Sequence, residues 1–162
     1  LKDTGSKKAH ALKTHIHEWG NGTEAISHME FVTEKVPLSG VVFLCLDDMQ
    51  ARKDICEHSL WDNPAVSLVI ETRMDASFII VHTLDPNDTR HREYWNMYWY
   101  PNDQMENEAG CGGPISVIST VEITAGIAVQ QLIDYSRERD TSAPYNQVQL
   151  NLRTWEIKKA KW

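Results

Sequence analysis

The feature that most limits the fold is an apolar run that ends abruptly in two acidic residues. Asp47 and Asp48 follow the run Val41-Val42-Phe43-Leu44-Cys45-Leu46. A continuous apolar run of this length is typical of a strand buried on both faces. In an open α/β sheet, ligands gather outside the carboxyl ends of the strands. The run therefore predicts an α/β fold in which Asp47 lies at a binding crevice.

Patterns along the rest of the chain predict helices and strands that alternate irregularly. Helices are expected where apolar residues recur at three- and four-residue intervals, and strands where β-branched runs lie between turn signals. Helices are predicted at residues 6–19, 49–61 and 114–137, strands at 25–34, 41–46, 66–72 and 78–83, a polar irregular stretch with an aromatic cluster at 85–107, and one last strand at 148–157. No repeat or linker divides the sequence, so a single domain over residues 1–162 is expected.

The charge and cysteine content narrow the classes of partner. The chain has 16 Lys+Arg against 23 Asp+Glu, a net charge of -7, which works against attraction to nucleic acid or an anionic membrane. Neither is an expected partner. Three cysteines without a C-x-x-C pair fit reduced thiols in the cytoplasm better than a disulfide framework or a zinc ribbon. No membrane-length apolar run is present. The first residue, Leu1, is not a methionine, so a fragment of a longer protein is expected.

The helix predicted at 114–137 is apolar on nearly every side. Such a helix is too hydrophobic to face solvent, so it is expected to pack against the sheet, against another subunit, or against both.

Three residues are candidates for chemistry, each with a plainer alternative. Lys8 lies near a helix start, where backbone N–H groups favour a phosphate, although a solvated lysine is the commoner case. Asp47 is a plausible ligand for Mg²⁺ or a ribose, and either Asp47 or Asp48 could instead cap the helix. Cys111 precedes a helix, whose positive end lowers a thiol pKa, and it could equally be an inert small residue.

These residues in this order resemble the ThiF/MoeB/ubiquitin-activating (E1-like) family, from about Gly5 to Tyr135. Gly5-x-x-Lys8-Ala9 looks like the family's G-x-x-K-A segment. The segment Cys45 to Arg52 is similar to its C-x-D-N-x-x-x-R segment, with Asp48 in place of asparagine. Asn107 to Pro114, with Cys111, looks like the region where many members carry a cysteine ahead of a dimer-packing helix.

The resemblance implies a Rossmann-like sheet with flanking helices and an adenylation reaction. Lys8, Asp47 and Arg52 would bind ATP, and Asp47 would also bind Mg²⁺. The C-terminus of a ubiquitin-like or sulfur-carrier protein would be adenylated, and Cys111 would then accept the acyl group as a thioester. A homodimer through residues 115–135 is implied as well.

Two departures from the family limit this interpretation. The Gly-rich nucleotide loop belongs upstream of Lys8, and residues 1–7 contain nothing that can act as one. The domain is therefore expected to be incomplete at its N-terminus and inactive alone. The zinc-binding C-x-x-C pairs of many members are also missing, which favours the zinc-free bacterial relatives.

Two other functions stay open at the level of sequence. One is another Rossmann-type nucleotide-binding domain, such as a dehydrogenase fragment in which Asp47 holds a ribose hydroxyl, although it lacks G-x-G-x-x-G as well. The other is a degenerate module without catalysis that binds a partner or dimerises through the 115–135 helix.

Overall fold

The computed structural model describes residues 7–20, 22–30, 32, 36–101, 117–137 and 146–162. These residues fall into two compact units, Leu1–Val32 and Thr33–Trp162, which are described separately. The expectation of a single domain stays a prediction. No helix among the described residues is long and apolar enough to cross a membrane.

The described part of the first unit contains one helix, as the sequence predicts. Helix α1 spans Lys8–Glu18 and ends at Gly20, whose positive φ of 64° suits a residue without a side chain. The strand predicted at 25–34 is wrong: residues 25–30 and 32 form no strand. Ile26 and Met29 are exposed, so an alternating pattern here lacks the neighbouring strand and the core that would stabilise it.

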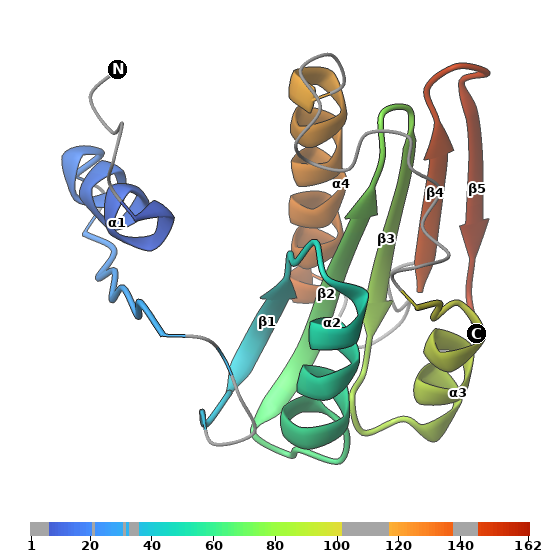
Figure 1. The fold of residues 1–162 in the computed structure, drawn as a ribbon, viewed down its shortest axis with the longest axis horizontal. Coiled ribbons are helices and arrows are strands. Elements are labelled where there is room, and N and C mark those ends of the chain that lie inside the picture. Colours follow the sequence, from blue (N-terminus) through green and yellow to red (C-terminus); the bar gives the residue numbers. More distant parts are fainter. Residues whose placement is uncertain (1–6, 21, 31, 33–35, 102–116, 138–145) are drawn as a thin grey trace. The chain divides into compact units, whose positions relative to one another are not determined.

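The second unit is built on a five-stranded mixed sheet in the order β1-β2-β3-β4-β5 (Figure 1). Strand β1 pairs with β2 in parallel, and all the other pairs are antiparallel. The α/β class with flanking helices is therefore confirmed and is compatible with a Rossmann-like fold. The strands span Gly40–Leu44 (β1), Val66–Met74 (β2), Phe78–Leu84 (β3), Gln147–Asn151 (β4) and Glu156–Ala160 (β5).

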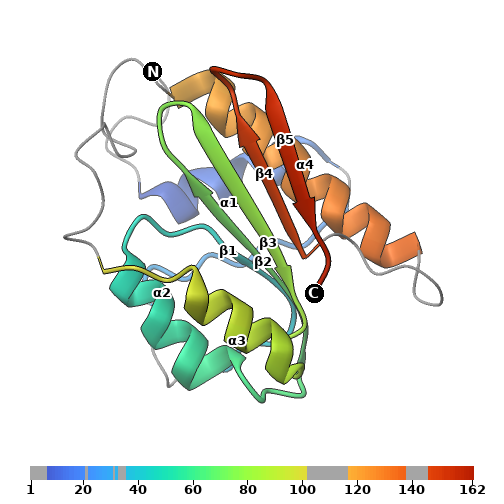
Figure 2. The same ribbon diagram turned by 90° about the vertical axis from the view of Figure 1, so that its right-hand side faces the viewer.

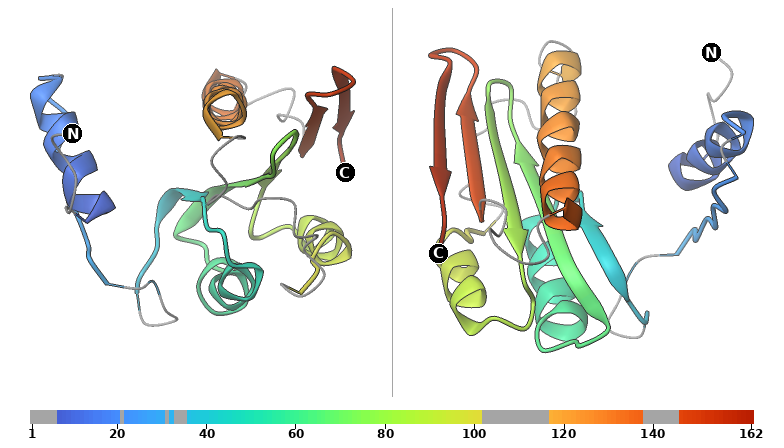
Figure 3. Two further views of the ribbon diagram at one scale, coloured as in Figure 1. Left: turned by 45° about the horizontal axis from the view of Figure 1, so that its top comes forward. Right: turned by 180° about the vertical axis from the view of Figure 1, so that it is seen from behind.

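Helices cover both faces of this sheet (Figures 2 and 3). On one face lie α2 (Met49–Ile55), which continues as a π-helical turn η1 (Cys56–Leu60), and α3 (Thr89–Met97). On the other face α4 (Val117–Arg137) packs against β2 and β3. The helices predicted at 49–61 and 114–137 are thus confirmed within their described residues.

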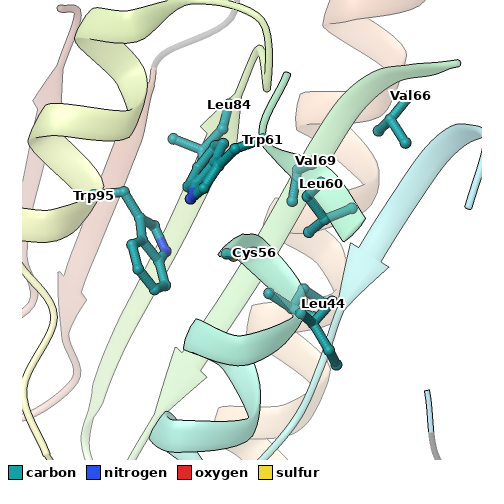
Figure 4. Close-up of a cluster of buried hydrophobic side chains, with 9 residues drawn as sticks. Leu44, Cys56, Leu60, Trp61, Val66, Val69, Leu84 and Trp95 are labelled. Atoms are coloured by element: carbon teal, nitrogen blue, oxygen red, sulfur yellow. The ribbon is translucent and has the colours of Figure 1, made fainter. Parts of the chain in front are cut away.

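Each face has its own hydrophobic core. Figure 4 shows the core beneath α2 and α3, where the indole rings of Trp61 and Trp95 meet edge to face at 5.8 Å. The core beneath α4 includes Leu68, Ile70, Ile79, Val81, Ala128 and Leu150. Because neighbouring residues of a strand point to opposite faces, β2 and β3 supply both cores and are buried on both sides.

Strand β1, in contrast, is not buried on both faces as predicted. It forms an edge of the sheet, and Val41 and Phe43 stay 36% and 43% exposed. Val42 and Leu44 point into the core beneath α2, whereas α4 packs on β2 and β3 and leaves the opposite face of β1 less covered. The apolar run indicated a strand correctly but not its position in the sheet.

Two further predictions are corrected in the second unit. Residues 89–97 form helix α3 instead of an irregular stretch, because Asp88 caps the helix by accepting a hydrogen bond from the backbone N–H of Arg90 at 2.9 Å. The last strand is in fact a hairpin of β4 and β5, which turns at Leu152 to Trp155.

Candidate functional site

The candidate site lies at the carboxyl end of β1, where the chain passes into α2. Residues 45–48, here called the Asp47 loop, join the two elements. Asp48 caps α2 by accepting a hydrogen bond from the backbone N–H of Ala51 at 2.9 Å. The side chain of Asp47 is exposed and has no hydrogen-bond or ion-pair partner among the described residues. The two acidic residues therefore have different surroundings, and the capping role belongs to Asp48.

Arg52 reaches back from α2 beneath this loop. Its side chain is only 5% exposed. Its guanidinium donates hydrogen bonds to the carbonyl oxygens of Leu44, at 3.3 Å, and of Leu46. A third bond, of 2.8 Å, goes to the carbonyl oxygen of Thr72 on β2. Arg52 therefore joins the ends of the two parallel strands and does not project toward solvent.

Glu71 is the centre of a buried polar cluster that contains Arg52. Its carboxylate accepts hydrogen bonds from Arg52 Nη1, from Arg73 Nε and Nη2, from His82 Nδ1 and from Trp95 Nε1, at 2.7 to 3.0 Å. We call Arg52, Glu71, Arg73, His82 and Trp95 the Glu71 cluster. Its members come from α2, β2, β3 and α3, so it ties together the elements on this face of the sheet.

The electrostatics of the cluster keep Glu71 ionised and His82 neutral. Burial alone would raise the pKa of the Glu71 carboxyl, but the hydrogen bond from His82 and the charges of both arginines outweigh it and hold that pKa well below its usual range. Burial lowers the pKa of His82 despite the nearby carboxylate. His82 Nδ1 then donates to Glu71, while Nε2 accepts from the amide of Gln147 at 2.9 Å.

The segment just after α3 contacts the start of α2 beside the Asp47 loop. The indole N–H of Trp99 donates a 3.0 Å hydrogen bond to the carbonyl oxygen of Met49, and Lys53 Nζ lies 4.5 Å from the centre of the same ring. Arg73 donates a 2.6 Å bond to the carbonyl oxygen of Tyr98. The segment after α3 is therefore attached both to α2 and to the Glu71 cluster.

The residues predicted to bind ATP are not all placed in one site. Lys8 is exposed as the first residue of α1 in the first unit, and Cys111 lies outside the described residues. Asp47 and Arg52 lie near each other in sequence and structure, but Asp47 faces solvent and Arg52 is buried. Their roles toward ATP and Mg²⁺ stay predictions.

The sequence interpretation missed Glu71, Arg73 and His82. A signal was present, because Glu71 and Arg73 are charged residues two apart within a largely buried strand, and His82 occupies a similar position in the next strand. Two charges on one face of a buried strand require partners, and such partners mark a structural or functional cluster.

A metal at this site would need most of its ligands from elsewhere. Among the described residues no group of three His, Cys, Asp or Glu side chains could hold a metal ion. Asp47 alone offers one carboxylate. One carboxylate does not by itself define a metal site, so Mg²⁺ binding by Asp47 stays a prediction.

Comparison with known proteins shows the fold alone. No family model matches the sequence, and no curated protein matches it. Among solved structures, selenomethionine-labelled PaaA is similar, with a TM-score of 0.64 and 18% identity over 97% of this chain and 55% of that one. The chain thus spans about half the length of PaaA. An identity this low supports the shared α/β architecture and no function.

Proposed function

We propose that the chain is part of a ThiF/E1-like enzyme of the cytoplasm that uses ATP and Mg²⁺ to adenylate the C-terminus of a ubiquitin-like or sulfur-carrier protein. The observation that carries the proposal is the exposed carboxylate of Asp47, which lies at the carboxyl end of a parallel strand and has no partner among the described residues. Ligands of α/β sheets bind at such strand ends. The proposal is also supported by the family resemblance, which rests on the order of Lys8, the Cys45–Arg52 segment and Cys111 in the sequence.

The proposed chemistry assigns a separate role to each residue. Asp47 would contribute an oxygen ligand to Mg²⁺, which would neutralise phosphate charge. A contact of Lys8 with the phosphates is implied by the family resemblance alone. The carrier carboxylate attacks the α-phosphorus of ATP and releases pyrophosphate. The Cys111 thiolate then attacks the acyl-adenylate, forms a thioester and releases AMP. The roles of Lys8 and Cys111 rest on the resemblance.

Residues 1–162 alone are not expected to bind ATP well. The segment upstream of Lys8 has no Gly-rich loop to hold the phosphates. Calorimetric titration of this chain with ATP and Mg²⁺ therefore gives no micromolar binding, and a micromolar dissociation constant would contradict this part of the proposal.

The decisive experiment compares two adjacent aspartates in the full product of the gene. Pyrophosphate exchange into ATP, dependent on a carrier protein, is expected to fall about 100-fold or more in Asp47→Asn, because a charged ligand of the phosphate site is lost. Asp48→Asn is the matched control, because asparagine caps a helix as well as aspartate does and activity is retained. Full activity in Asp47→Asn, or none in the wild type, would contradict the proposal.

The outer face of α4 supports a homodimer through residues 115–135. Its exposed side chains include Ile118 (81% exposed), Val121 and Val129, with Ala125 and Gly126 between them. Its buried side chains include the polar residues Thr120, Thr124 and Gln131. A helix that turns apolar residues outward and buries polar ones favours a covering partner. We propose a second copy of the chain as that partner.

A further inference from the structure

We infer that the Glu71 cluster and Trp99 hold the Asp47 loop from both sides, which makes Arg52, Glu71 and Trp99 positioning residues for the Asp47 carboxylate. What Asp47 binds rests on the proposed function. The fixation of the loop rests only on contacts in the second unit.

The side before Asp47 is fixed by Arg52. Its two hydrogen bonds to the carbonyl oxygens of Leu44 and Leu46 flank Cys45 and end one residue short of Asp47. The bond to Thr72 joins the same guanidinium to β2, and Glu71 holds it in orientation at 3.0 Å. Only a planar guanidinium presents several donors in this fixed geometry.

The side after Asp47 is fixed by the start of α2. The carbonyl oxygen of Met49 accepts a hydrogen bond from the indole N–H of Trp99. The Asp48 side chain caps the first turn of α2. Arg73 connects this side to the first, because it binds both Glu71 and the carbonyl oxygen of Tyr98. One cluster therefore controls both ends of a short loop whose single exposed acidic side chain without a described partner is Asp47.

The cost of the cluster favours positioning over simple stabilisation. Glu71 is fully buried and Arg52 and Arg73 nearly so. Replacing buried ion networks with apolar side chains of similar volume is often neutral or stabilising. The Glu71 cluster lies at a strand end and is hydrogen-bonded to the backbone beside the exposed Asp47 carboxylate. Its role is therefore to fix the position of that carboxylate.

The test measures backbone order in the Asp47 loop of the 162-residue chain by NMR relaxation. Trp99→Phe keeps an aromatic ring under Lys53 but removes the bond to Met49. Arg52→Lys keeps a positive charge beside Glu71 but removes the planar guanidinium that donates to several carbonyl oxygens at once. In the wild type, order parameters at residues 46–48 are expected near 0.85, and in both variants they fall toward 0.6. Residues 79–81 of β3 serve as the internal reference, and Trp155→Phe, at an exposed tryptophan, is the matched control.

The outcomes separate positioning from general destabilisation. A fall confined to the loop supports the inference. No change in Trp99→Phe, or an equal fall in β3, would overturn it. In the full gene product, Trp99→Phe is also expected to raise the KM for ATP–Mg²⁺ more than it lowers kcat. If the loop loosens but the wild type shows no adenylation, the proposed function fails and the positioning inference stands.

Discussion

At the scale of single residues, Glu71 carries the greatest consequence for stability. Glu71→Gln leaves Arg52 and Arg73 buried with their carboxylate removed. Breaking a buried ion pair in this way costs about 3–5 kcal/mol, and urea denaturation is expected to show a loss of that size. The exposed Glu93 offers a control, since Glu93→Gln should change stability by no more than about 0.5 kcal/mol. A loss below about 1 kcal/mol in Glu71→Gln would contradict the buried network.

The titration of His82 is expected to make the stability of the fold depend on pH. Its pKa in the folded chain is lowered, chiefly by burial, so the unfolded chain takes up its proton first as the pH falls below about 6.5. Stability contributed by neutral His82 is therefore complete above that pH and decreases below it. The free energy of unfolding, followed from pH 7 to pH 5, is expected to fall.

The matched variant for this pH dependence is His82→Asn, which keeps an N–H for Glu71 but does not titrate. Its decrease between pH 6.5 and 5 is expected to be smaller than that of the wild type. Part of the decrease remains, because burial lowers the pKa of His91 as well. An unchanged slope in His82→Asn would show that His82 does not contribute.

Asp47 and Asp48 differ in what they do for the fold. Asp48→Ala removes the cap of α2 and is expected to lower stability by about 1 kcal/mol. Asp47→Ala changes an exposed side chain without a described partner, so its effect stays within about 0.5 kcal/mol. Thermal or urea denaturation distinguishes them. A larger loss in Asp47→Ala would mean that Asp47 is needed for the fold and weaken its assignment as a ligand.

At the scale of elements, local patterns predicted the central strands better than the edge of the sheet. Strands β2 and β3 were predicted because both segments are rich in β-branched residues. Strand β1 is equally apolar. Its position at the edge of the sheet depends on which strands pair with it, and a local sequence pattern does not contain that information. Residues 25–30 alternate suitably for a strand, yet no strand pairs with them.

Helix α3 was missed for a different reason. The sequence from Asp85 to Trp99 is polar and aromatic, which hid the recurrence of His91, Trp95 and Trp99 at four-residue intervals after the capping Asp88. The single buried side chain of α3 is Trp95, which is held by its bond to Glu71. That hydrogen bond forms only in the folded tertiary structure. The spacing of residues in the sequence alone therefore could not predict helix α3 or the Glu71 cluster.

At the scale of the whole molecule, the proposed homodimer depends on the outer face of α4. If a second copy covers Ile118, Val121 and Val129, the chain is a dimer in solution. Val129→Glu places a charge on that face and is expected to convert the dimer to a monomer, because burying an unpaired carboxylate is costly. Sedimentation equilibrium over a range of concentrations measures the change in mass.

A matched control for this experiment is Leu12→Glu, which adds the same charge at an exposed position of α1. It should leave the mass unchanged. A wild type that stays monomeric at high concentration would refute the dimer. A dimer that survives Val129→Glu would instead place the interface elsewhere, and the apolar face of α4 would then need another partner. Measuring the oligomeric state therefore tests whether a second copy of the chain covers the isoleucine and valine side chains that this helix exposes.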